Sequence, residues 1–187
     1  MHLPLIRRLT PGQRSSCRGT CYNFWDTDYH QEALEPYMRY LLVDHITEWK
    51  AGESIRGVKN VAMSEDFLEF HFPKNPIMPG VMLLEAITQL TGWLEAASSD
   101  FTQWFLISGV NKCSFYGFAF PGDQVELRVE FVSSPGENRK VFKGTGMVQG
   151  KKKIAVEFEG SLVPFDELED GEEQRRFFDL LTRNLGL

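Results

Sequence analysis

The stretch that decides the fold is HFPKNPIMPGVMLLEAITQLTGWLEAA, residues 71–97. Its first half has a proline at every third position, at Pro73, Pro76 and Pro79. Each proline fixes φ and removes a backbone donor, so we expect a stiff extended connector and neither a helix nor a central strand. From Gly80 to Ala97 apolar residues occupy almost every face of a helix. This pattern predicts a long helix that is buried on nearly all sides.

Segments rich in β-branched and aromatic residues lie on both sides of this helix. Two predicted strands precede it and four follow it, at residues 40–49, 54–63, 104–110, 125–133, 140–148 and 153–163. Turn residues separate the later ones, at Pro121-Gly122-Asp123, Pro135-Gly136 and Gly150. A single buried helix among hairpin-linked strands predicts an α+β protein, with an antiparallel sheet around a central helix.

Length and composition limit the classes of protein that fit. The chain has 187 residues, of which 42% are hydrophobic and 25% are charged, as expected for one soluble globular domain. A formal net charge of −6 argues against a general nucleic-acid binder. No apolar run reaches the ~18 residues of a membrane span. The three Cys residues follow no disulfide pattern, which indicates free thiols and a cytoplasmic protein.

The chain divides into three predicted regions. Residues 1–25 are a flexible N-terminal extension, residues 26–165 are the folded domain, and residues 166–187 are an acidic tail that forms a helix on the surface. Residues 26–38 suit a short helix or turn. The extension contains arginines and no acidic residue, so an organellar transit peptide is the alternative interpretation. Its Cys17 and Cys21 lack nearby partners for a zinc site, and no metal is expected.

Three residues around the connector have the properties of a catalytic site. Glu85 lies near the start of the apolar helix, where its carboxylate would be partly desolvated. His71 precedes the connector, which holds it in a fixed relation to that helix. The N–H of Gly80, the first helical residue, lacks an intrahelical acceptor and can stabilise charge on a carbonyl oxygen. The plainer alternatives are a Glu85 that points outward and a His71 packed in the core.

The string from His71 to Glu85, HFPKNPIMPGVMLLE, resembles the β-hydroxyacyl-acyl-carrier-protein dehydratases of bacterial type II fatty-acid synthesis. It matches their motif HFPxNPxMPGVxxxE at every defined position. Further matches lie at residues 41–44, 110–112, Phe115 and 121–124. This resemblance extends over about residues 40–163 and implies a hot-dog fold, an antiparallel sheet wrapped around a long central helix. It also implies a homodimer, and trimers of dimers are known in the family.

The resemblance implies a role for each residue of the site. His71 would abstract the C2 proton of a (3R)-hydroxyacyl thioester, and Glu85 of the partner subunit would help protonate the departing 3-hydroxyl. Gly80, followed by Val81, would bind the thioester carbonyl. The product would be the trans-2-enoyl thioester, and no metal or organic cofactor would be needed. Glu85 stands where the isomerising branch of the family has Asp, which implies dehydration without isomerisation.

The resemblance also predicts a partner, the acyl carrier protein. Carrier proteins are acidic, so basic contacts are expected, and Lys74 and Arg128 are the candidates. The chain departs from the family at Phe70, where glycine is common, and at residues 36–40, which read PYMRY in place of HRYPF. These departures leave the acyl length and the pathway open.

Two other functions compete with the dehydratase. One is a hot-dog thioesterase or a hydratase that acts on coenzyme A thioesters. The other is a non-catalytic module that binds acyl chains. The intact His71 motif argues against a thioesterase, and a binding module would be expected to have lost His71 or Glu85.

Overall fold

The computed structural model describes residues 40–136, 138–168, 170–183 and 185. The described residues belong to one compact unit, residues 39–187. The predictions for residues 1–25 and 26–38, including Cys17, Cys21 and the transit peptide, lie outside the described residues. The domain limits at residues 25/26 and 165/166 stay predictions.

Helix α2, Gly80–Ser98, confirms the predicted central helix to within one residue. It begins after Pro79, which has an extended ψ of 135°. It ends where Asp100 and Phe101 take left-handed φ values of 54° and 59°. The N–H of Phe101 donates to the carbonyl oxygen of Ala96 at 2.7 Å, so a backbone hydrogen bond closes the last turn.

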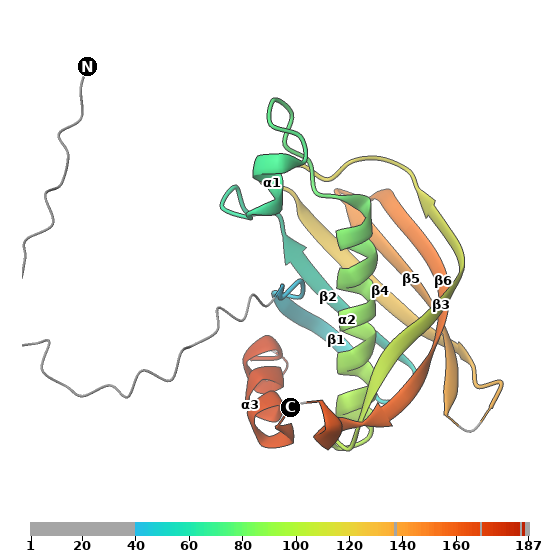
Figure 1. The fold of residues 1–187 in the computed structure, drawn as a ribbon. Helices are drawn as coiled ribbons and strands as arrows, with labels where there is room; N and C mark the ends of the chain where they lie inside the picture. The colour runs from blue at the N-terminus through green and yellow to red at the C-terminus, as the bar shows by residue number, and fades with distance from the viewer. Residues whose placement is uncertain (1–39, 137, 169, 184, 186–187) are drawn as a thin grey trace, which may run out of the picture. The chain divides into compact units, whose positions relative to one another are not determined.

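Six antiparallel strands form one sheet in the order β1-β2-β4-β5-β6-β3, and Figure 1 shows this sheet curving around α2. The strands are β1 His45–Lys50, β2 Ser54–Asn60, β3 Gln103–Phe115, β4 Gln124–Ser133, β5 Arg139–Val148 and β6 Lys151–Pro164. All six predicted strands are present, and the α+β hot-dog fold is confirmed. Side chains alternate between the faces of the sheet, as in β4, where Val125, Leu127 and Val129 are buried.

The first predicted strand begins later than expected, at His45. Residues 40–42 hydrogen-bond to a helix: Gln89 of α2 donates to the carbonyl oxygen of Tyr40 and accepts from the N–H of Leu42, both at 2.9 Å. Strand β3 continues to Phe115, well past the predicted end at residue 110. β3 is an edge strand that pairs with β6 alone among the described residues. Lys112 lies opposite Glu157 of β6 and its side chain is exposed, so the strand continues through it.

Helix and sheet approach closely at Gly144 of β5. A Cβ atom at this position would overlap the side chain of Ile87 on α2. Only glycine therefore lets the helix lie this near to the strand. The core around this contact is aliphatic and aromatic, with Leu90, Phe142 and Phe158 fully buried.

Helix α3, Gly171–Leu181, confirms the predicted tail helix. The side chain of Asp170 accepts hydrogen bonds from the N–H groups of Glu172 and Glu173, at 2.8 and 3.1 Å, which caps its first turn. The inner face of α3 is not on the surface: Phe178 and Leu181 join the core cluster. None of the described helices is long and apolar enough to cross a membrane.

Candidate active site

His71 follows the short helix α1, Phe67–Phe70, and forms its C-terminal cap. Its Nδ1 lies 3.0 Å from the carbonyl oxygen of Ile77. Since a carbonyl can only accept, Nδ1 must carry the proton. In the neutral ring Nε2 is then left unprotonated with a free lone pair, as a general base requires.

Backbone hydrogen bonds fix the connector that follows His71. Phe72 and Asn75 exchange N–H···O bonds of 3.3 and 2.9 Å, and the N–H of Ile77 donates to the His71 carbonyl oxygen at 2.9 Å. The N–H of Met78 donates to Ala119, between β3 and β4, also at 2.9 Å. The side chains of Ile77 and Met78 are buried. The predicted extended connector is therefore a tight loop followed by an extended run. At Met78 it is hydrogen-bonded to the segment between β3 and β4.

Glu85 lies in the second turn of α2 and is exposed in the single chain. The desolvation expected from its apolar neighbours is therefore absent within one protomer. Its carboxylate accepts hydrogen bonds from Thr88 Oγ1 at 3.1 Å and from Gln89 Nε2 at 2.9 Å. Because Gln89 is itself bonded to residues 40–42, the orientation of the carboxylate is linked to the chain segment that leads into β1.

The first turn of α2 presents free backbone donors. The N–H groups of Gly80 and Val81 have no backbone acceptor among the described residues. A Cβ atom on Gly80 would come within 2.8 Å of the Phe115 ring, so glycine is required for β3 to pass this close to the helix. The side chain of Val81 is 66% exposed. Two N–H groups beside an exposed apolar surface can bind a carbonyl oxygen of an apolar substrate.

His71 and Glu85 do not hydrogen-bond to each other in the described part of this chain. Apolar surface is exposed on the elements around them. Its members are Met63, Phe70, Phe72, Val81, Phe115, Phe118 and Phe120. The free edge of β3 is also apolar, with Leu106, Ile107 and Val110 exposed. So many exposed apolar side chains on these elements indicate an interface or a ligand groove.

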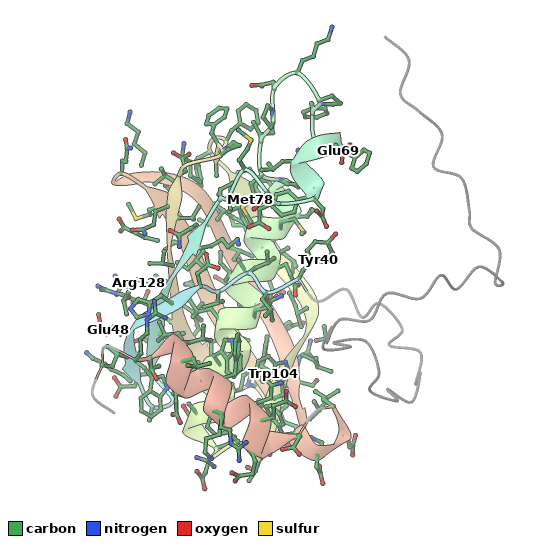
Figure 2. The ribbon with its side chains drawn as sticks, turned by 90° about the vertical axis from the view of Figure 1, so that its left-hand side faces the viewer. Tyr40, Glu48, Glu69, Met78, Trp104 and Arg128 are labelled. Atoms are coloured by element: carbon green, nitrogen blue, oxygen red, sulfur yellow. The ribbon has the colours of Figure 1, made fainter. Side chains whose placement is uncertain are left out.

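The two candidate carrier contacts lie in different places. Lys74 is exposed at the tip of the connector loop. Arg128 is on β4 and forms an ion pair with Glu130. Figure 2 shows Arg128 near Glu48, at mid-height, while Met78 of the connector lies higher. Of the two candidate contacts, Lys74 is part of the connector, whereas Arg128 lies on the sheet apart from it.

Three residues of the site were not predicted from the sequence: Thr88, Gln89 and Phe115. The signal for the first two was their spacing: residues three and four positions after Glu85 lie on the same face of a helix. The contact of Phe115 with Gly80 depends on how β3 passes the helix, which no local pattern specifies. The described residues contain no group of three or more His, Cys, Asp or Glu side chains that could hold a metal ion.

Comparisons with known proteins show the family of this chain. A family model described as a FabA-like domain matches residues 35–159. The chain is 39% identical over 121 residues to a protein of Nitratidesulfovibrio vulgaris named 3-hydroxyacyl-[acyl-carrier-protein] dehydratase FabZ, a match that covers 63% of this chain and 77% of that protein. It is 35% identical over 136 residues to a protein of the same name from Oceanobacillus iheyensis, covering 72% and 94%.

Solved structures share the fold at low sequence identity. The protein smu.793 of Streptococcus mutans, solved with acetyl CoA, has a TM-score of 0.53 and 14% identity, covering 68% of this chain and 94% of that one. A dehydratase heterocomplex, ApeI:P, of Xenorhabdus doucetiae has a TM-score of 0.51 and 16% identity, covering 66% and 99%. These likenesses show the fold alone. This chain belongs to the FabA-like family, because the model of the FabA-like domain matches residues 35–159 and because the chain aligns with most of the length of its curated relatives.

Proposed function

We propose that this protein dehydrates (3R)-hydroxyacyl-acyl-carrier-protein to the trans-2-enoyl thioester, in fatty-acid or related lipid synthesis. The observation that supports the proposal most strongly is the hydrogen bond from His71 Nδ1 to the Ile77 carbonyl oxygen, which leaves Nε2 as a base. The names of the relatives, 3-hydroxyacyl-[acyl-carrier-protein] dehydratases, supply the substrate and the reaction.

The chemistry follows from three groups. The Gly80 and Val81 N–H groups bind the thioester oxygen and stabilise the negative charge that develops there. Nε2 of His71 removes the C2 proton, and the electron pair of that bond forms the C2–C3 double bond as the C3–O bond breaks. A protonated Glu85 gives its proton to the departing hydroxyl, which leaves as water. The enzyme returns to its starting state when the proton on His71 returns to Glu85 through solvent.

We propose a homodimer in which His71 of one subunit works with Glu85 of the other. The absence of a hydrogen bond between the two residues in the described part of one chain, and the exposed apolar side chains of the edge strand β3, support this arrangement. A partner on this surface would also supply the desolvation that Glu85 lacks in the single chain. A trimer of dimers would require a further interface. The proposed location is the cytoplasm.

We further propose dehydration without isomerisation, because position 85 holds Glu where the isomerising branch has Asp. A glutamate carboxyl extends one methylene further from the helix, so it approaches the substrate from a different position. A cis-3-enoyl product in a coupled assay would contradict this proposal.

The decisive experiment supplies the purified protein with (3R)-hydroxyacyl-acyl-carrier-protein of several chain lengths and measures the trans-2-enoyl product. The same acyl groups on coenzyme A are run in parallel, and the release of free thiol is monitored. Turnover on the carrier without thiol release supports the proposal. Thiol release would favour a thioesterase, preference for coenzyme A a hydratase, and tight binding without turnover a non-catalytic acyl-binding module.

A further inference from the structure

A buried lysine lies beneath the loop that leads to the catalytic histidine. The side chain of Lys59, on β2, is only 4% exposed. Its Nζ lies 2.5 Å from Glu65 Oε1 and 3.7 Å from Asp44 Oδ1. Lysine is rarely buried to this extent unless it is paired, because its charge loses the stabilisation of water. The two carboxylates therefore account for the burial of Lys59.

The ion pair joins a rigid strand to a short loop. β2 is hydrogen-bonded on both sides, to β1 and to β4, so the position of Lys59 is fixed by the sheet. Asp44 is fixed too, since its Oδ2 accepts a hydrogen bond from the N–H of Asn60 at 2.5 Å. Glu65, by contrast, lies in the loop between β2 and α1. Its ion pair with Lys59 ties this loop to the strand.

Glu65 connects directly to the helix that ends at His71. Its carbonyl oxygen accepts a hydrogen bond from the N–H of Leu68 at 3.0 Å, in the first turn of α1. The N–H of His71 donates to the carbonyl oxygen of Phe67 at 3.1 Å and closes the same helix. His71 is only six positions after Glu65, so a rotation of the loop at Glu65 moves the imidazole.

Apolar packing alone does not fix this orientation. Leu68 is the buried side chain of α1 and its neighbour Phe67 packs partly buried against the core, and these non-directional contacts hold the helix near the core without defining its rotation. The charge-assisted contact of 2.5 Å between Lys59 and Glu65 sets a short distance between the strand and the loop. Catalytic groups must be held to within about 0.5 Å, which makes this distance restraint relevant to the reaction.

We propose that Lys59 is a positioning residue: through its ion pair with Glu65 it fixes α1, and so fixes the imidazole of His71 relative to α2. The proposal rests on the dehydratase function, because it assigns Lys59 to the same site. Lys59 itself touches no reacting atom.

The chain offers a matched control in a second buried pair. Glu95 of α2 is 3% exposed, and its Oε2 lies 2.5 Å from Nζ of Lys140 on β5. Glu95 is ten residues beyond Glu85 on the same helix, or about 15 Å along its axis. Removing the charge of either glutamate breaks a buried ion pair, but only Glu65 is linked to His71.

The experiment compares Glu65→Gln with Glu95→Gln in the full-length enzyme. Glu65→Gln is expected to lower kcat by about 10- to 100-fold, with KM changed less than about twofold, since the base is misplaced but the substrate still binds. Glu95→Gln is expected to lower the melting temperature and leave kcat near the wild-type value. Glu65→Asp, which keeps the charge, is expected to recover part of kcat. Equal losses of kcat in the two Gln variants, or an unchanged kcat in Glu65→Gln, would overturn the proposal.

A second measurement does not depend on activity. The ¹⁵N shifts of the His71 ring report its tautomer, and in the wild type they are expected to show a proton on Nδ1. Glu65→Gln should move them toward a mixture of tautomers and Glu95→Gln should not. A wild type without dehydratase activity that shows these shifts would refute the proposed function and leave the positioning role standing. If Glu65→Gln does not fold, Asp44→Asn removes the second, more distant carboxylate beside Lys59 and should give a smaller change of the same sign.

Discussion

The two ends of α2 differ in how completely this chain covers them. At the C-terminal end Trp93 and Leu94 are buried. The ring of Trp93 packs against that of Phe178 of α3 in a tilted arrangement, with ring centroids 6.0 Å apart. At the N-terminal end Val81 and Glu85 are exposed. The covered end is stabilised by the chain itself. The open end combines apolar surface with the proposed acid, the proposed base and the N–H groups of the first turn, so the candidate site lies where this chain leaves apolar surface uncovered.

The largest expected effect is at the open end. His71→Ala and Glu85→Gln should each lower kcat by roughly 10²- to 10⁴-fold, as expected for loss of a general base or acid. Glu85 is exposed, so Glu85→Gln should change the free energy of unfolding by less than about 0.5 kcal/mol, whereas His71→Ala loses the hydrogen bond to Ile77 and should lower it by about 1 kcal/mol. Product formation and chemical denaturation measure the two quantities. Loss of activity together with loss of folding would show a structural role.

Mixing the two inactive variants sharpens this prediction. In a mixed dimer one site combines both changes, and the other has His71 from one subunit and Glu85 from its partner, both intact. With random pairing about a quarter of wild-type activity should return. Each variant refolded with itself is the control. No recovery in verified mixed dimers would mean that the two residues act within one chain.

The second effect is at the covered end and concerns stability. Phe178→Ala should lower the free energy of unfolding by about 3–5 kcal/mol, because it removes a buried ring from the aromatic contacts between α2 and α3. The activity of the folded fraction should be unchanged. Leu180→Ala, on the exposed face of the same helix, is the control and should change stability by less than about 0.5 kcal/mol. Equal losses in the two variants would show that α3 does not close this end.

A smaller effect is expected from the residue that orients the acid. Gln89→Leu removes the hydrogen bond to Glu85 and the two bonds to residues 40–42. Misplacement of the acid should lower kcat by about 10- to 100-fold, near the low end here because the Thr88 hydroxyl still donates to the Glu85 carboxyl group. Gln174→Leu on α3 serves as the control. A wild-type kcat in Gln89→Leu would show that Thr88 alone orients Glu85.

The smallest effect concerns the carrier protein. Lys74→Glu should raise KM for carrier-bound substrate by about 3- to 10-fold, because it places a negative charge opposite an acidic partner. KM for a pantetheine thioester, which lacks the carrier, should not change. Arg128→Glu is measured beside it: a rise in KM there would extend the contact to β4. An unchanged KM in Lys74→Glu would exclude the connector from the docking surface.

Local patterns predicted the elements well where one rule dominated. The prolines at 73, 76 and 79 and the apolar run after them predicted the connector and α2, because a proline excludes helix whatever its surroundings. Turn residues located the hairpins between β4, β5 and β6, because proline and glycine favour the backbone conformations of turns. Predictions failed where tertiary contacts replaced local ones, as at residues 40–42, whose backbone bonds to Gln89, and at residues 111–115, where pairing with β6 extends β3 beyond its predicted end.

The sequence by itself determined the chemistry of this protein: the types and spacing of His71, Gly80 and Glu85, and the helix that two of them share. It did so because proline geometry and helical periodicity are properties of neighbouring residues. Only the tertiary structure decided which ring nitrogen of His71 is free, which side chains orient Glu85, and how Lys59 reaches Glu65. These contacts join residues only three to six positions apart, but the loop geometry and the side-chain orientations that form them are set when the sheet closes around α2.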